Sequence, residues 1–121
     1  MKQRLGGLDA QIRAIKRELT ALADLRPGTL TRQYTVCGSP GCRCKARPPQ
    51  KHGPYYHLSY TRHGKGGTRL IQPADVATVR AAVATYTRLK RLVDRWIDLA
   101  TELSDLKLQQ RAAARSPAKR R

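Results

Sequence analysis

Apolar residues recur with heptad spacing at both ends of the chain, and this pattern constrains the fold more than any other feature. The first series advances in steps of three and four, through Leu5, Leu8, Ile12, Ile15, Leu19 and Leu22. The second starts as Val76, Val79, Val83 and Tyr86 and, after a one-residue phase slip, continues through Leu89, Leu92, Trp96, Leu99, Leu103 and Leu106. Such spacing is typical of helices that pair along a seam. It predicts an N-terminal helix over residues 8–25 and a long helix over residues 74–108.

The middle of the chain has the composition of β-strands. Residues 29–36, 55–62 and 68–72 are rich in β-branched and aromatic side chains, and the glycine-rich residues 63–67 suit a hairpin turn. Pro27 should end the first helix beforehand, because the residue before proline avoids helical angles. The sequence therefore predicts an α+β fold, with a small three-stranded antiparallel β-unit over residues 29–72 between two helices that pair as a coiled coil.

At 121 residues the chain is expected to form a single domain, over residues 1–110. Phenylalanine is absent and aromatic residues make up 5%, so a large aromatic core is excluded. Two helices that pair along one seam leave some of their apolar residues exposed. A homodimer through the helices would bury these residues. Residues 111–121 carry five bases and no acid, and we expect this basic tail to be disordered.

Three cysteines and a histidine lie close together in the loop before the second predicted strand. They form a C-x4-C-x-C motif followed by a histidine, and the four residues are Cys37, Cys42, Cys44 and His52. Three thiolates and an imidazole are a ligand set that zinc takes in structural tetrahedral sites. A metal would also explain how an eighteen-residue, proline-rich loop stays ordered. The sequence predicts a structural zinc knuckle.

Other readings of these residues stay open at this point. The thiols could be free or reversibly oxidised, because neighbouring bases favour the reactive thiolate. Two cysteines could form a small disulfide with the third left over, although an odd number argues against a disulfide framework. His57 and His63 compete for the fourth ligand position, and His52 is preferred because it lies in the loop.

The charge of the chain points to a polyanionic partner. There are 25 Lys and Arg residues against 8 Asp and Glu, a net charge of +17. Residues 25–74 contain nine bases and no acid, whereas solvated surfaces usually mix both signs. Nucleic acid is the first candidate because counterion release favours phosphate contact, and an anionic membrane surface is the second. The candidate nucleic-acid contacts are Arg32, Arg43, Lys45, Arg47, Lys51, Tyr55, Arg62, Lys65 and Arg69.

One face of the predicted β-unit should pack on the helices. Alternation places Tyr56, Leu58 and Tyr60 on that face, and Tyr55 and His57 on the other. The other face, with Arg62, Lys65 and Arg69 around the hairpin turn, is expected to be free to contact phosphates, or nucleobases that stack on tyrosine.

The sequence offers no catalytic constellation. It has no paired carboxylates in its middle, no nucleophile turn with a Ser/His/Asp order, and no phosphate-cradling loop. We expect a protein that is not an enzyme. The start of the chain does not read as a secretory signal and no apolar run is long enough to cross a membrane, so the expected location is cytoplasmic.

Several segments resemble an uncharacterised family of short bacterial and archaeal proteins. The resemblance covers about residues 26–103 and is carried by CG-x-PGCRC at residues 37–44 and HGPYY-x-LSY at residues 52–60. Members of that family occur near mobile elements and transposase-like genes, which implies a role in DNA transactions. The family has no established activity to carry over.

Together these observations predict a non-enzymatic nucleic-acid-binding accessory protein with a structural zinc knuckle, for which DNA is favoured over RNA. One alternative is a helical adaptor, or a subunit of a larger nucleoprotein complex, whose helices dock a protein partner. Another is a thiol redox sensor, which would contain no bound metal and would lose binding on mild oxidation.

Overall fold

The computed structural model of the protein describes residues 2–119, and internal contacts group them into two compact units. The helical unit comprises residues 2–22 and 88–119, and the sheet unit comprises residues 23–87. Helix α2 (Val76–Lys119) contributes to both. The single domain expected over residues 1–110 is thus a chain with two separate apolar cores.

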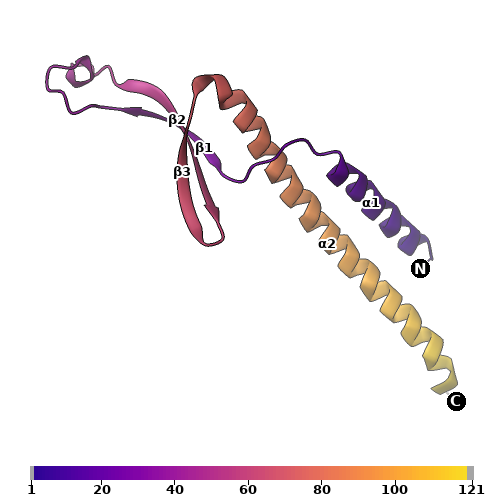
Figure 1. The fold of residues 1–121 in the computed structure, drawn as a ribbon. Coiled ribbons are helices and arrows are strands. Elements are labelled where there is room, and N and C mark those ends of the chain that lie inside the picture. The colour runs from indigo at the N-terminus through magenta and orange to yellow at the C-terminus, as the bar shows by residue number, and fades with distance from the viewer. Residues whose placement is uncertain (1, 120–121) are drawn as a thin grey trace. The chain divides into compact units, whose positions relative to one another are not determined.

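The helical unit pairs α1 (Lys2–Thr20) with the later part of α2 (Figure 1). Its core consists of buried side chains from both helices, Leu8, Ile12, Ile15 and Leu99. The helices run antiparallel, because successive contacts join low numbers in α1 to high numbers in α2. Glu18 accepts from Arg88 at 3.2 Å and Gln11 accepts from Arg95 at 3.1 Å, while Arg4 pairs with Glu102. Whether this pair supercoils, or joins a second copy, stays a prediction.

The helix boundaries differ from those predicted. α1 begins at Lys2 and not at residue 8, and it runs through the Gly6–Gly7 pair, because packing and the Arg4–Glu102 ion pair hold its first turns. It ends at Thr20, where the amides of Ala21 and Leu22 turn back onto the carbonyls of Glu18 and Leu19 at 3.1 and 3.3 Å.

The basic tail was predicted wrongly over most of its length. α2 does not stop near residue 108 but continues as helix to Lys119. Residues 112–114 are alanines, the strongest helix formers, and this propensity outweighs the repulsion among the sparse bases. Residues 120–121 of the predicted tail lie outside the described residues.

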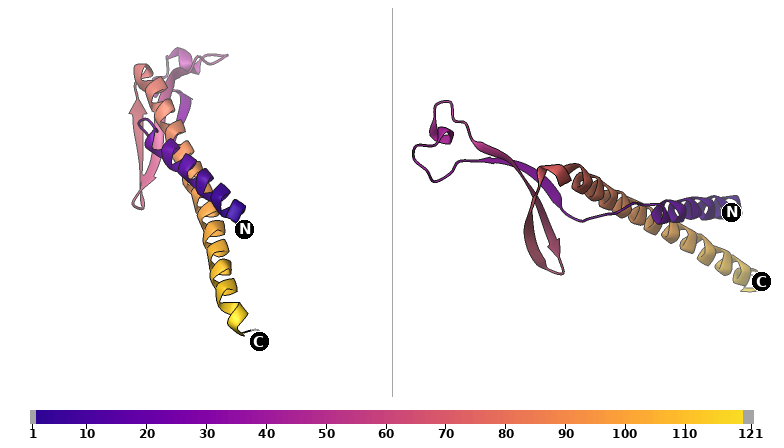
Figure 2. Two further views of the ribbon diagram at one scale, coloured as in Figure 1. Left: turned by 90° about the vertical axis from the view of Figure 1, so that its right-hand side faces the viewer. Right: turned by 45° about the horizontal axis from the view of Figure 1, so that its top comes forward.

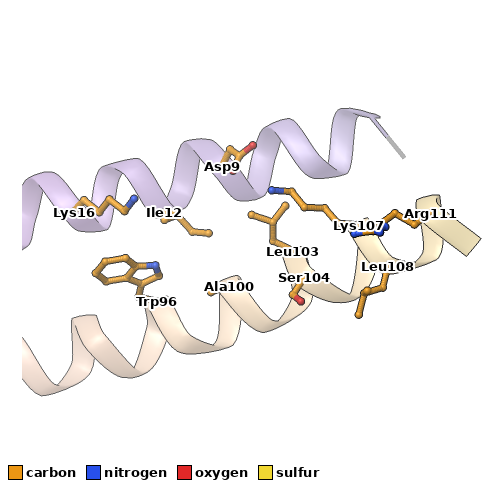
Figure 3. Close-up of a pocket in the computed structure, with 10 residues that line it drawn as sticks. All are labelled: Asp9, Ile12, Lys16, Trp96, Ala100, Leu103, Ser104, Lys107, Leu108 and Arg111. Carbon is orange, nitrogen blue, oxygen red and sulfur yellow. The ribbon is translucent and has the colours of Figure 1, made fainter.

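An open cavity of about 530 Å³ lies beside the helical seam (Figure 3). Trp96 of α2 and Lys16 of α1 line it, and the lysine Nζ lies 5.3 Å from the indole centroid in a cation–π contact. Towards its far end the lining passes to Leu108, which is exposed.

The sheet unit holds a three-stranded antiparallel sheet in the order β1-β2-β3, so the predicted α+β fold is confirmed. The strands are β1 (Thr29–Thr35), β2 (His52–Arg62) and β3 (Lys65–Ile71). The hairpin turn is shorter than predicted, with only His63 and Gly64 between β2 and β3, and both have positive φ angles of 53° and 78°. Two short 3₁₀ turns, Arg43–Lys45 and Pro73–Asp75, complete the unit.

The start of α2 covers one face of the sheet. Leu58, Ile71 and Val76 are buried there, and Tyr56, Tyr60 and the valines of the first helical turns pack against them. This explains the phase slip between Tyr86 and Leu89 in the sequence. Before the slip the apolar residues of α2 face the sheet, and after it they face α1, since the boundary between the units falls at residues 87 and 88.

Within residues 2–119, no helix combines the length and the apolar character that a membrane span requires.

Candidate metal centre

Cys37, Cys42, Cys44 and His52 lie together in the loop that joins β1 to β2. Figure 1 shows this loop at one end of the sheet, and the hairpin turn between β2 and β3 at the other end; the views in Figure 2 agree. The four ligand atoms, three Sγ and one imidazole nitrogen, all lie within 4.8 Å of one another. The candidates His57 and His63 are not in this cluster. We call residues 37–51 the knuckle loop.

Local structure brings the cysteines together. A turn over residues 39–42 closes where the amide of Cys42 donates to the carbonyl of Ser39 at 3.2 Å. The 3₁₀ turn Arg43–Lys45 follows at once, and there the amide of Lys45 donates to the carbonyl of Cys42 at 2.9 Å. In an extended chain the Cα atoms of Cys42 and Cys44 would lie about 7 Å apart, and this turn brings the two residues closer together. His52 is the first residue of β2, so this strand supplies the fourth candidate ligand.

The separations suit a tetrahedral metal site. The Sγ atoms of Cys37 and Cys44 lie 3.6 Å apart, and the Sγ of Cys42 lies 3.1 Å from the Nε2 of His52. Zinc with Zn–S bonds of about 2.3 Å places two thiolates about 3.8 Å apart. The cluster therefore needs only small side-chain adjustments to hold an ion. Burial supports an internal site, because Cys44 is 1% exposed and the other three are half-buried.

The surroundings favour the thiolate at Cys37. The backbone amide of Ser39 is the largest cause, and the His52 side chain and the thiols of Cys44 and Cys42 act in the same direction. Against a small opposing effect of burial, they lower the pKa of Cys37 from 9.0 to about 6. A metal ligand must lose its proton, so this environment prepares Cys37 for coordination.

Cys44 has the opposite shift. The amide of Cys37 donates to its sulfur at 3.4 Å, which lowers the pKa. Burial, the thiols of Cys37 and Cys42 and the charge of Cys37 outweigh that hydrogen bond and raise the pKa of Cys44. Neighbouring thiols cannot all ionise, because adjacent thiolates repel one another. A bound cation would remove this repulsion and stabilise the thiolates together.

The knuckle loop presents four bases to solvent. All four side chains are exposed, those of Arg43, Lys45, Arg47 and Lys51. Lys45 also ties into the cluster, since its Nζ donates to the carbonyl of Cys37. Sequence reasoning missed this hydrogen bond and the role of the Ser39 amide, because both depend on the fold of the loop and have no motif of their own.

The sheet register corrects the predicted placement of the other bases. Arg69 pairs with Leu58, Arg32 with Tyr56, and Arg62 with Lys65. Residues paired in this way point to the same side, so these bases share the face of Leu58, which α2 covers. The expectation that Arg62, Lys65 and Arg69 accompany the free face is wrong. These side chains are nevertheless exposed to solvent, at the margins of the covered face.

The opposite face of the sheet, which we call the open face, has no charged residue. Its members are the alternate residues of the three strands that share a side with Tyr55, and they are Thr29, Thr31, Gln33, Tyr55, His57, Ser59, Thr61, Gly66, Thr68 and Leu70. Of the predicted nucleic-acid contacts, only Tyr55 lies on this face.

Fold and site together define a small α+β protein whose sheet carries a Cys₃His cluster able to bind a metal. The chain belongs to the DUF6788 family, a domain of unknown function, whose model matches residues 5–81. This confirms an uncharacterised family, and the match includes α1, which the resemblance over residues 26–103 had left out. No curated protein and no solved structure matches the chain.

Proposed function

We propose that the protein is a non-enzymatic nucleic-acid-binding accessory protein in which a zinc ion on Cys37, Cys42, Cys44 and His52 fixes the knuckle loop. The observation that carries the proposal is the position of four exposed bases on the same short loop as the four ligand atoms. Zinc is the metal proposed because three thiolates and an imidazole are its usual structural donors. DNA is the expected partner.

Charge supports the assignment of the sheet unit as the binding part. Residues 23–87 contain ten bases against two acids, Asp24 and Asp75, so this unit carries a net charge of +8. Both acids lie outside the stretch of residues 25–74. The chain segments that hold the helical unit, residues 1–22 and 88–121, carry a similar net charge of +9, but they contain six of the eight acids of the chain, four of them on α2. Phosphate contact therefore suits the sheet unit better, because repulsion from acids is least there.

Salt-dependent binding tests the proposal. The zinc-loaded full chain is titrated with a labelled DNA duplex at several salt concentrations, and the logarithm of affinity should fall linearly with the logarithm of salt. Replacing the four knuckle-loop bases by glutamine should reduce the slope by about 3 to 4, because each phosphate contact contributes about 0.9. Treating the wild type with a chelator should also lower its affinity, since the bases lose their fixed positions.

A matched variant separates the loop from bulk charge. It replaces four exposed bases of the helical unit by glutamine, namely Arg13, Arg17, Arg91 and Arg115. The same loss of charge should leave the slope nearly unchanged. Equal losses in both variants would contradict a role for the knuckle loop, and the absence of salt-dependent binding to any nucleic acid would remove the proposed function.

A second candidate is association of two copies through the helical unit. The sequence predicts such a dimer, because the paired helices leave apolar residues exposed. Val93, Ile97 and Leu108 of α2 are large, apolar and exposed, and intervals of four and eleven residues place them on one side of the helix. The core they flank has only four buried residues. We expect light scattering to give the mass of a dimer, and Ile97→Lys to return it to a monomer. A monomeric wild type would instead favour an adaptor that docks a different protein.

A further inference from the structure

The open face of the sheet is unusual for a solvated surface in this chain. Charged residues make up 27% of the sequence, yet none of the ten open-face residues is charged. The solvated side of an antiparallel sheet usually carries mixed charges. Here the charges lie at the margins of the covered face, and the open face presents mainly hydroxyl groups, with an amide, a histidine and a tyrosine.

Two ring side chains stand along the middle strand of this face. Tyr55 and His57 are two residues apart on β2, which places their Cα atoms about 7 Å apart on the same side. Tyr55 is 40% exposed and His57 is half-buried. Their neighbours across the strands are Gln33 and Thr31 on β1 and Leu70 on β3. Flat rings flanked by small donors and acceptors can both stack and hydrogen-bond a planar partner.

The charges of the sheet unit limit what that partner can be. A duplex presents phosphates on its outside, and the open face has no cation to neutralise them. A single strand can turn its bases towards a neutral surface and leave its phosphates at the edges. Basic side chains are available at these edges to contact the phosphates. Lys51 precedes β2 at one end, and Arg62 and Lys65 flank the hairpin turn at the other end. A second sheet or another protein would find little apolar area, since Tyr55 and Leu70 are the only large apolar side chains on this face.

We propose that the open face binds the bases of a single-stranded nucleic acid, with Tyr55 and His57 as stacking side chains and the hydroxyl and amide groups beside them as hydrogen-bond partners. This inference rests on the proposed function and specifies its ligand. It assigns a base-contacting role to the neutral face, distinct from the phosphate contacts of the knuckle loop.

Base-dependent binding tests the inference. The zinc-loaded full chain is titrated, at one salt concentration, with a labelled single strand of about 12 nucleotides and with an abasic strand of the same length. The base-bearing strand should bind at least about five-fold more tightly, the gain expected from stacking one base. Tyr55→Ala should remove most of that difference, and Tyr55→Phe, which keeps the ring, should preserve it.

Tyr34 supplies the matched control. It lies on β1 and is 49% exposed, but it is on the other side of the sheet, where the Arg32 guanidinium is 5.9 Å from its ring centroid. Tyr34→Ala should therefore leave the preference for the base-bearing strand intact. Retained zinc content in every variant shows that the loop is still folded.

The outcomes distinguish this inference from the proposed function. Equal, salt-dependent affinity of the wild type for both strands overturns base stacking and leaves phosphate binding in place. Absence of binding to either strand and to the duplex overturns both proposals. A Tyr55→Ala variant that changes the mass of the free protein without changing base dependence assigns the open face to a second copy, and this too overturns the inference.

Discussion

The Sγ atom of Cys42 lies 3.1 Å from the Nε2 atom of His52, so a contact between side chains ten residues apart closes the knuckle loop onto the first residue of β2. A metal at this point would join the knuckle loop to the start of β2. The loop then depends on the ligands for its order, whereas the sheet has its own core around Leu58. Loss of metal should accordingly affect the sheet unit and not the helical unit.

Replacing His52 by Ala should abolish zinc binding. The purified wild type should contain one zinc per chain, and His52→Ala none, by elemental analysis. At free zinc one hundred times the dissociation constant, the ion stabilises the fold by about 2.7 kcal/mol, which the variant forfeits. His63→Ala is the control, because this histidine lies in the hairpin turn outside the cluster. A metal-free wild type prepared without chelator, or zinc loss in the control, would contradict the site.

The chain contains separate reporters for its two units. All five tyrosines lie in residues 23–87, and the single tryptophan, Trp96, lies in the helical unit. In His52→Ala the unfolding transition followed by tyrosine near-ultraviolet circular dichroism should move to lower denaturant concentration. The transition followed by Trp96 fluorescence should stay in place. Equal shifts of both signals would show that the metal stabilises the chain as a whole.

The thiol of Cys37 should react at lower pH than ordinary thiols. The Ser39 amide and the other cluster side chains lower its pKa to about 6, and only the thiolate is alkylated. In metal-free, reduced protein, iodoacetamide labelling followed by peptide mass spectrometry should show half-maximal reactivity of Cys37 near pH 6. Cys44 should react only at a pH above its ordinary 9.0, because its pKa is raised. Similar pH profiles for the two cysteines would contradict this environment.

The same shift makes the stability of the metal-free protein depend on pH. Between about pH 6 and pH 9 the folded state holds Cys37 as thiolate, while the unfolded state holds it as thiol. The free energy of unfolding should therefore rise with pH across this window, and the contribution should be lost as pH falls through about 6. The raised pKa of Cys44 has the opposite effect on the free energy of unfolding, and only above pH 9.0. Urea titrations of the wild type and of Cys37→Ser measure the difference, which should be absent in the variant.

Gly53 occupies a position that other residues cannot take without strain. Its φ angle is +127°, and a Cβ atom there would lie 2.8 Å from the carbonyl oxygen of Gln33. Gly53→Ala should destabilise the protein by more than about 1 kcal/mol and weaken zinc binding through its neighbour His52. Gly38→Ala, in the knuckle loop, is the control, because a Cβ atom there has no neighbour within 4 Å. Equal effects of the two substitutions would argue against this constraint.

The sequence predicted those features of the fold that depend on local periodicity. Heptad spacing identified both helices, and β-branched and aromatic runs located three strands to within a few residues. The register could not be read in the same way, since it depends on which residues pair across β1, β2 and β3. Arg62 and Arg69 were for this reason assigned to the wrong face, although Leu58 was assigned correctly.

The Cys/His cluster is a second case in which local information sufficed. The cysteine spacing and the position of His52 in the loop selected the four residues whose ligand atoms the structure brings within 4.8 Å. The two-unit division was not predicted, even though the phase slip between Tyr86 and Leu89 marks it. A slip in a heptad pattern indicates a change of packing partner as readily as a local defect, and only the tertiary structure decides between them.

Leu58 should be the most sensitive position of the sheet unit. It is 1% exposed and packs with Ile71 and Val76, so it joins two strands to the start of α2. Leu58→Ala should destabilise the unit by about 2–5 kcal/mol, because the cavity left behind adds to the lost burial. Leu70→Ala removes the same atoms from a side chain that is 54% exposed and should change stability by less than about 0.5 kcal/mol. The tyrosine signal reports the effect, and a small one at Leu58 would show that the stability of the sheet unit does not depend on this core.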